Sequence, residues 1–133
     1  MSTLLESIKA TQATTDQSSL LAVATFFGVP PTGDVMQRLT GKGSSVLDRV
    51  KNGGKLGSAD DRVHLEVLAA FVRELRSYLV GTLGPSSPDA AGMERWLAAG
   101  QVQAGAQTYR PIEALSDRTL AVGALNTLRS TLD

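Results

Sequence analysis

The sequence contains no cysteine and a single histidine, His64. The absence of cysteine excludes disulfide bonds, thiol catalysis and thiolate metal sites, and it is compatible with a reducing cytoplasm. One imidazole cannot form a zinc site by itself, because zinc in proteins takes at least three protein ligands. We therefore expect no metal and no cofactor in this chain.

An excess of charge of either sign is also missing. The 13 Lys and Arg residues balance 13 Asp and Glu residues, so the formal net charge is zero. A neutral chain lacks the large basic field that draws many proteins to nucleic acid. Any contact with DNA must therefore come from the local placement of basic residues.

Long apolar runs are absent as well. No stretch approaches the roughly 18 apolar residues that suggest a membrane span, and the first residues lack a basic start followed by an apolar run. We expect a cytoplasmic, unprocessed protein without a membrane segment. Its 133 residues, 42% of them hydrophobic, can bury a core without metal or disulfide support.

Alternating patterns typical of β-strands are missing too, and apolar residues recur at helical spacing instead. We predict an all-α fold in which an N-terminal helix-turn-helix-like bundle is joined by a long helix to a small C-terminal helical domain. The expected boundaries are residues 1–17 for an N-terminal helix or arm, 18–57 for the helix-turn-helix-like domain, 58–84 for the connecting helix and 85–133 for the C-terminal domain.

Capping residues set the expected ends of the helices, because Ser, Thr and Asp are favoured as N-caps, Pro at the first helical position and Gly after the last. The expected N-caps are Ser18 or Ser19, Thr32, Ser44 or Ser45, and Asp117. The predicted helices are Thr3–Ala13, Ser19–Phe27, Thr32–Thr40, Ser44–Asn52 and Ala59–Val80, followed by helices that begin at Pro88, Pro111 and Asp117. The Gly-, Ala- and Gln-rich segment 100–108 is expected to be an irregular loop.

The sequence holds no combination of residues typical of catalysis. His64 lies in the long helix, where a partly buried structural histidine is the simpler interpretation. The pair Asp60-Asp61 is explained by the preference for acidic residues at helix N-termini, and Asp117 by capping. The segment "GKGSS" lacks the spacing and the preceding strand of a phosphate-binding loop. We therefore expect that the chain is not an enzyme.

Two short helices joined by a glycine-containing turn, and preceded by an apolar helix, are typical of a helix-turn-helix. Here they are Thr32–Thr40 and Ser44–Asn52. The candidate DNA-binding residues are Lys42, Ser44, Ser45, Arg49, Lys51 and Lys55. Asp48 on the second helix would repel phosphate. One alternative is a helical bundle whose solvated face is basic. Another alternative places the helix-turn-helix over the segment "FFGVPPTGDVMQRL".

The order of these parts resembles the MbcA/ParS/Xre family of antitoxins over about Leu20 to Leu132. The segment "GDVMQRLTGKGSSVLDRV" resembles the family's degenerate helix-turn-helix, and "RVHLEVLAAFVRELRSYL" resembles its long helix. Trp96-Leu97, "RPIEAL" and "AVGALNTLRS" resemble its toxin-binding domain. The chain departs from the family at "AAGQVQAGAQTY", where an Asn-Pro pair and a double glycine are common.

The resemblance implies an antitoxin that binds a cognate toxin, typically a RES-domain enzyme that consumes NAD, and covers its active-site entrance. NAD would be the substrate of the toxin and not a cofactor of this chain. Such antitoxins can also repress their own promoter, usually as dimers, so operator DNA and a homodimer are implied as well.

Interfaces favour Tyr and Arg anchors, which gives the C-terminal part its candidate contact residues. The candidate toxin-binding residues are Tyr109, Arg110, Pro111, Glu113 and Arg118. The residues assigned a structural role are Trp96, Leu97, Ile112 and Leu115. Two other functions are open: a DNA-binding regulator, such as a phage repressor, whose C-terminal half serves dimerisation, and a structural helical protein with neither role.

Overall fold

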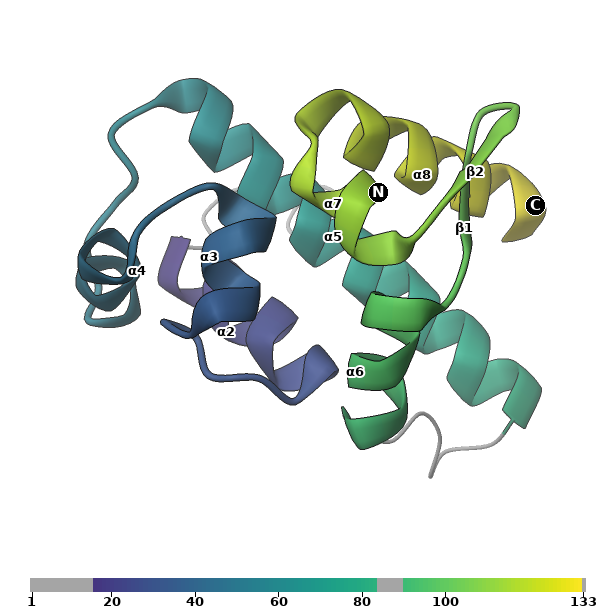
Figure 1. The fold of residues 1–133 in the computed structure, drawn as a ribbon, viewed down its shortest axis with the longest axis horizontal. Helices are drawn as coiled ribbons and strands as arrows, with labels where there is room; N and C mark the ends of the chain where they lie inside the picture. The colour runs from purple at the N-terminus through teal and green to yellow at the C-terminus, as the bar shows by residue number, and fades with distance from the viewer. Residues whose placement is uncertain (1–15, 84–89, 133) are drawn as a thin grey trace, which may run out of the picture.

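Apolar residues at helical spacing fold most of the chain into helices. The computed structural model describes residues 16–83 and 90–132 (Figure 1). The elements in these ranges are α2 (Asp16–Phe27), α3 (Asp34–Thr40), α4 (Ser44–Lys51), α5 (Ala59–Leu83), α6 (Ala90–Ala99), β1 (Val102–Ala104), β2 (Gln107–Tyr109), α7 (Pro111–Ser116) and α8 (Arg118–Leu132). The all-α prediction is confirmed, because the two strands have only 3 residues each. The predicted helix Thr3–Ala13 and the predicted helix start at Pro88 lie outside the described residues.

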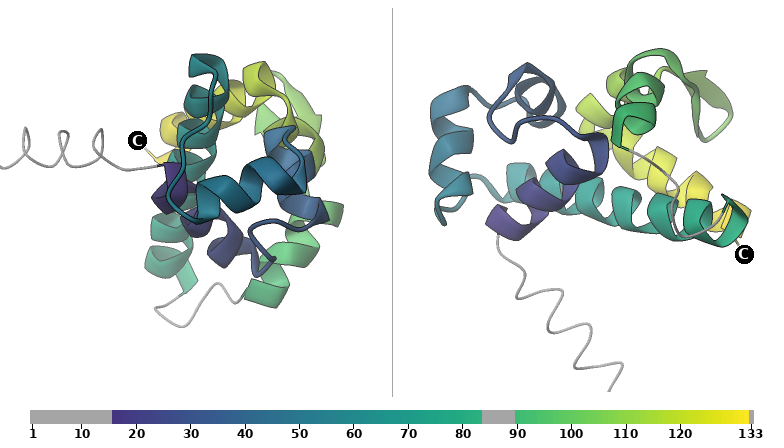
Figure 2. Two further views of the ribbon diagram at one scale, coloured as in Figure 1. Left: turned by 90° about the vertical axis from the view of Figure 1, so that its left-hand side faces the viewer. Right: turned by 90° about the horizontal axis from the view of Figure 1, so that it is seen from below.

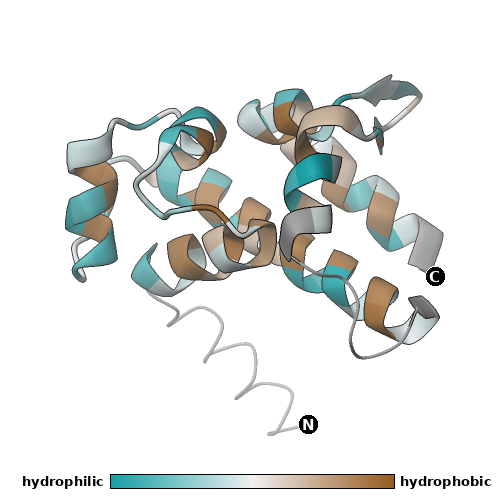
Figure 3. Cartoon of the chain, turned by 60° about the horizontal axis from the view of Figure 1, so that its bottom comes forward, coloured by the Kyte–Doolittle hydropathy of each residue, from teal (hydrophilic) through white to brown (hydrophobic). Residues whose placement is uncertain are grey.

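The long helix α5 is the element on which the others pack. Its 25 residues cross the whole molecule in Figures 1 and 2 and extend past the predicted end at Val80. Helices α2 and α8 both lie against it. Figure 3 shows apolar and hydrophilic segments alternating along α5, as expected of a helix with one buried stripe. The buried apolar residues of α5 are Leu65, Leu68, Phe71, Val72 and Leu75.

Helix α8 lies beside α5 and runs in the same direction. Arg118, at the start of α8, places Nη1 2.9 Å from Oδ2 of Asp60 in the first turn of α5. Further along both helices, Nε of Arg129 lies 2.8 Å from Oε1 of Glu74. Because the two ion pairs join the helices in the same order, α5 and α8 are parallel.

One apolar cluster contains residues of every helix in the described ranges. It begins with Leu20 in α2 and ends with Leu125 in α8. The parts that the sequence assigns to separate domains therefore share a core, and the exact boundaries between them stay a prediction. The largest fully buried side chains are Phe27, Phe71, Leu20, Met36, Leu39, Leu47, Leu68, Leu97, Leu115, Val23, Val50 and Pro111.

Several helices begin at residues other than the predicted caps. Ser18 and Ser19 lie inside α2 (Asp16–Phe27) and not before it, so the cap predicted there is wrong. The Asp16 carboxylate accepts a hydrogen bond from the Leu56 N–H at 2.7 Å. Helices α3 and α4 follow glycines in extended conformation and have no side-chain cap, so the caps predicted at Thr32 and at Ser44 or Ser45 are wrong. The cap at Asp117 is confirmed by the 3.0 Å bond from the Leu120 N–H to Oδ1.

The prediction of an irregular loop over residues 100–108 is wrong, since this segment contains the antiparallel hairpin of β1 and β2. Gly105 takes a φ of +66°, as the first central residue of a two-residue hairpin turn requires. Its N–H donates to Oγ1 of Thr127 at 3.0 Å, and Ala104 packs on Gly123. Helix α8 therefore supplies the surface that holds the hairpin, which a short local pattern could not indicate.

Candidate functional site

Helix α7 separates buried from exposed side chains within a single turn and a half. Pro111 occupies its first position, where the missing N–H has no intrahelical partner in any case. Its buried residues are Pro111, Ile112, Ala114 and Leu115. Arg110 and Glu113 are exposed on the other side. The core thus fixes the backbone from which these two charged side chains project.

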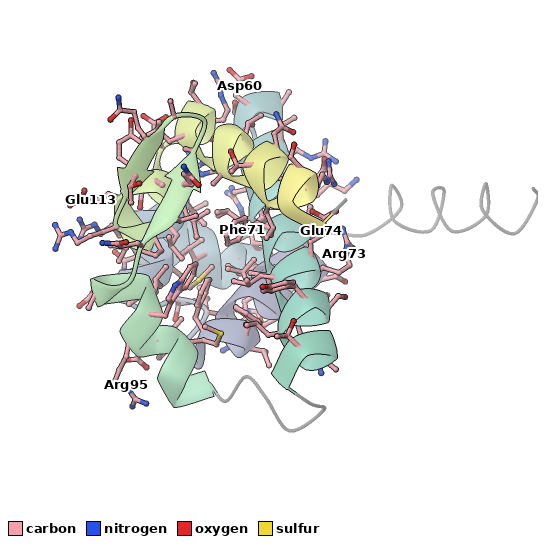
Figure 4. All side chains as sticks on the ribbon, turned by 90° about the vertical axis from the view of Figure 1, so that its right-hand side faces the viewer. Asp60, Phe71, Arg73, Glu74, Arg95 and Glu113 are labelled. Atoms are coloured by element: carbon pink, nitrogen blue, oxygen red, sulfur yellow. The ribbon has the colours of Figure 1, made fainter. Side chains whose placement is uncertain are left out.

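Arg110 and Glu113 form an ion pair with each other. Nε of Arg110 donates to Oε1 of Glu113 at 2.9 Å, and Nη2 reaches the same oxygen. Figure 4 shows Glu113 at the edge of the molecule, on the side of the hairpin. Pairs as exposed as this one contribute little to stability, so the pair orients two side chains at the surface more than it holds the fold together.

The end of α7 is attached to α5 through His64. The imidazole Nε2 lies 2.8 Å from the carbonyl oxygen of Leu115, and the histidine is only 8% exposed. Since a carbonyl oxygen can only accept a hydrogen bond, Nε2 carries the proton and donates it. The lone histidine of the chain therefore positions α7 on the long helix.

The structure separates the candidate toxin-binding residues into different environments. Tyr109 is half-buried at the end of β2, whereas Arg110 and Glu113 are exposed. Pro111 was expected among the contact residues, but it is fully buried because it packs into the core at the start of α7. Its side chain therefore supports the surface and does not belong to it.

Arg118 lies at a polar pocket where the first turns of α5 and α8 meet. The pocket has a volume of about 260 Å³ and is lined by Asp60, Asp61, His64, Asp117, Arg118 and Thr119. Each of its three carboxylates has a partner within the fold: Arg118 for Asp60, Lys42 for Asp61 at 2.6 Å, and the Leu120 N–H for Asp117. In the ranges that the structure describes, no group of three or more His, Cys, Asp or Glu side chains could hold a metal ion.

Trp96 and Leu97, which were assigned a structural role, lie in α6 beside the core. Leu97 is 1% exposed, and the half-buried Trp96 ring stacks on Phe71 with ring centroids 6.4 Å apart. A Cβ at Gly100 would lie 2.4 Å from Cδ1 of Trp96. The indole therefore also covers the backbone where α6 ends and the hairpin begins. Ile112 and Leu115 are buried as well.

The candidate DNA-binding residues lie on and around α4, at one end of the molecule (Figure 1). Only Leu47 and Val50 of this helix are buried. The exposed candidates are Ser44, Ser45, Arg49, Lys51 and Lys55. Lys42 is half-buried and paired with Asp61, so its charge is partly neutralised. The helix-turn-helix arrangement of α3 and α4 stays a prediction.

Sequence reasoning missed two features of this region. The hairpin turns at Gly105 and lies beside Gly123, and only the glycine inside "AVGAL" could have indicated that another segment packs on α8. The pocket was missed because Asp60 and Thr119 are far apart in the sequence and meet only through the parallel packing of their helices.

In residues 16–83 and 90–132, no helix has the length and apolar character needed to cross a membrane. No protein-family model, no curated protein and no solved structure matches the chain.

Proposed function

We propose that this chain is an antitoxin that binds a RES-type, NAD-consuming toxin and blocks the entrance of its active site. The observation that carries the proposal is that α7 has one buried and one exposed side. The buried side holds the backbone in place, and Arg110 and Glu113 project from the exposed side beside the hairpin. Exposed arginines and a partly exposed tyrosine on a rigid support are typical of the anchors of protein interfaces. The proposed class of partner follows from the resemblance of the sequence to MbcA/ParS/Xre antitoxins.

The proposed mechanism is steric and includes no reaction by this chain. Tyr109, Arg110, Glu113 and Arg118 would contact the toxin, and NAD would be excluded from the toxin's site. The protein would act in the cytoplasm, as a homodimer, and the same dimer would repress its own promoter.

The test begins with the genes that flank the gene of this chain: a RES-type protein encoded there is used in an inhibition assay, and the absence of such a gene would contradict the proposal. The wild-type chain is expected to stop NAD consumption by that protein, and Arg110→Ala is expected to weaken inhibition by about tenfold or more, as the loss of an interface anchor does. Arg129→Ala is the matched control, because Arg129 has a comparably exposed side chain and also pairs with a glutamate, at the far end of α8. Undiminished NAD consumption in the presence of the wild-type chain would contradict the proposal.

A second candidate function is DNA-binding regulation through α4. It is favoured by the exposure of Ser44, Ser45, Arg49 and Lys51 on a helix that buries only two side chains. Basic side chains on such a helix could neutralise phosphates, whereas the exposed Asp48 on the same helix opposes this role.

DNA binding would be tested with the chain's own upstream DNA. The double variant Arg49→Ala, Lys51→Ala should lose affinity and flatten the dependence of affinity on salt, because each phosphate contact releases counterions. Arg73→Ala, Arg76→Ala is a matched control, since it removes two exposed arginines from α5. Binding that does not change with salt would contradict this function.

A further inference from the structure

Helices α5 and α8 carry most of the exposed large apolar side chains. In the described ranges four such residues are exposed, and three of them, Val63, Tyr78 and Val122, belong to these two helices. Val63 is 47% exposed and Tyr78 is 42% exposed. Single exposed apolar residues are common on protein surfaces, whereas a group of them on one face indicates an interaction site.

The parallel packing of α5 and α8 places these residues along the line where the two helices meet. Val63 lies one turn beyond Asp60 on α5, and Val122 lies one turn beyond Arg118, the ion-pair partner of Asp60, on α8. Because the helices run in the same direction, the two exposed valines lie at the same level. Tyr78 lies about four turns further along α5. The exposed apolar residues therefore lie towards both ends of one face, here called the α5/α8 face.

Two charged residues of opposite sign border the α5/α8 face. Glu66 and Arg73 are exposed and are seven residues apart, which places them two turns apart on the same side of α5. In the described ranges neither side chain forms an ion pair within the fold. Figure 4 shows Arg73 on the outer side of the helix, turned away from Phe71 in the core. Both charges are therefore available to another molecule.

We propose that the α5/α8 face binds a second copy of this chain in an antiparallel contact with two-fold symmetry. In such a contact, residue i of one copy meets residue j of the other, and j meets i. A two-fold axis beside Ala70 brings Glu66 of each copy to Arg73 of the other, because these positions lie at nearly equal distances on either side of it. The same axis brings Val63 to Tyr78. Ala70 is small and half-buried, so the two α5 helices can approach closely at the axis.

The size of the α5/α8 face is sufficient for a dimer. Helices of 25 and 15 residues are about 37 and 22 Å long and about 10 Å wide, so their outer sides offer roughly 600 Å² in each copy. Two copies together bury roughly 1,200 Å², which is the lower end of the range for specific interfaces. This assignment of a surface rests on the homodimer in the proposed function and does not depend on the toxin.

The decisive variant is Val63→Asp, measured by analytical ultracentrifugation of the full-length chain. The wild type is expected to be a dimer at about 50 µM, and the variant should raise the dissociation constant about a hundredfold or more, because a two-fold contact buries the new charge twice. Leu21→Asp is the matched control, since Leu21 is an exposed large apolar residue on α2, and it should stay dimeric. A Val63→Asp variant that dimerises like the wild type would overturn the inference and leave the homodimer standing.

An exchange of charges tests the antiparallel arrangement without placing a charge in the apolar part of the face. Glu66→Arg and Arg73→Glu each bring like charges together across the axis, so each should raise the dissociation constant about tenfold. Loss of one charge without reversal has little effect on such an exposed pair. The double variant Glu66→Arg, Arg73→Glu restores opposite charges and should return to within about threefold of the wild type. A double variant as weak as the single ones would overturn the antiparallel contact.

The oligomeric state of the unaltered chain provides a further test. A wild-type chain that stays monomeric at about 100 µM would overturn the inference, and the homodimer of the proposed function would fail with it. Inhibition of the toxin is measured separately and does not decide this point. Cross-links from the region of Ala70 to residues 1–15 of the same chain or to the toxin, in place of a second copy, would also overturn the inference.

Discussion

His64 and Leu115 are 51 positions apart in the chain and are joined by a hydrogen bond of 2.8 Å between the imidazole Nε2 and the carbonyl oxygen. The bond connects the early part of α5 with the end of α7. Both residues are buried, so loss of the donor would leave the Leu115 carbonyl without this partner.

We predict that His64→Ala lowers the free energy of unfolding by about 1–3 kcal/mol, the usual cost of leaving a buried polar group unsatisfied. Urea denaturation measures this change. Glu66→Ala is the control on the same helix, because Glu66 is exposed, and its effect should stay within about 0.5 kcal/mol. Equal stability of the two variants would show that the His64 bond contributes nothing.

The Asp16 carboxylate attaches the start of α2 to the segment before α5. It is 5% exposed and accepts the Leu56 N–H at 2.7 Å. Asp16→Ala should lower the free energy of unfolding by about 1–3 kcal/mol. Asp16→Asn keeps an acceptor oxygen and should lower the free energy of unfolding by less than Asp16→Ala does. Thermal unfolding of both variants checks this order, and a more stable Ala variant would contradict it.

Gly100→Ala should destabilise the chain because the new Cβ would lie 2.4 Å from Cδ1 and 2.7 Å from the carbonyl oxygen of Trp96. Overpacking of this kind costs about 1–3 kcal/mol. Trp96 is the only tryptophan, so its fluorescence reports the displacement directly. Gly57→Ala, which meets nothing within 4 Å, is the matched control and should not lower stability or change the fluorescence.

Gly123→Ala should instead stabilise the chain. Gly123 lies inside α8, where glycine costs roughly 0.5–1 kcal/mol relative to alanine. The added Cβ would lie 3.5 Å from Cβ of Ala104, an ordinary packing distance. We therefore expect the free energy of unfolding to rise by about 0.5–1 kcal/mol in urea denaturation. A decrease would mean that the hairpin cannot accommodate even a methyl group on α8.

The helical class and most helices could be predicted from the sequence because their apolar residues recur at helical spacing. The N-caps were less predictable, since Gly33 and Gly43, which have no side chain, take the N-cap positions of α3 and α4 in place of the neighbouring Thr and Ser residues. The hairpin was not predictable from its own residues. Its strands are short, and it is held by contacts with α8, where Thr127 accepts the Gly105 N–H and Ala104 lies beside Gly123.

The candidate site could be predicted only in part for the same reason. Arg110 and Glu113 are charged and follow a loop pattern, so their exposure was expected. Pro111 stands between them, and a local pattern does not reveal that it fills the core. The polar pocket and the contact of His64 with Leu115 arise from the packing of α5 on α7 and α8, which no short segment encodes.

The parallel packing of α5 and α8 has an electrostatic consequence. Helices that lie side by side in the same direction align their dipoles, so two partially positive ends meet at one place. Here that place carries the carboxylates of Asp60, Asp61 and Asp117. These side chains offset part of the repulsion between the aligned dipoles, each by about 0.3–1 kcal/mol where it is exposed.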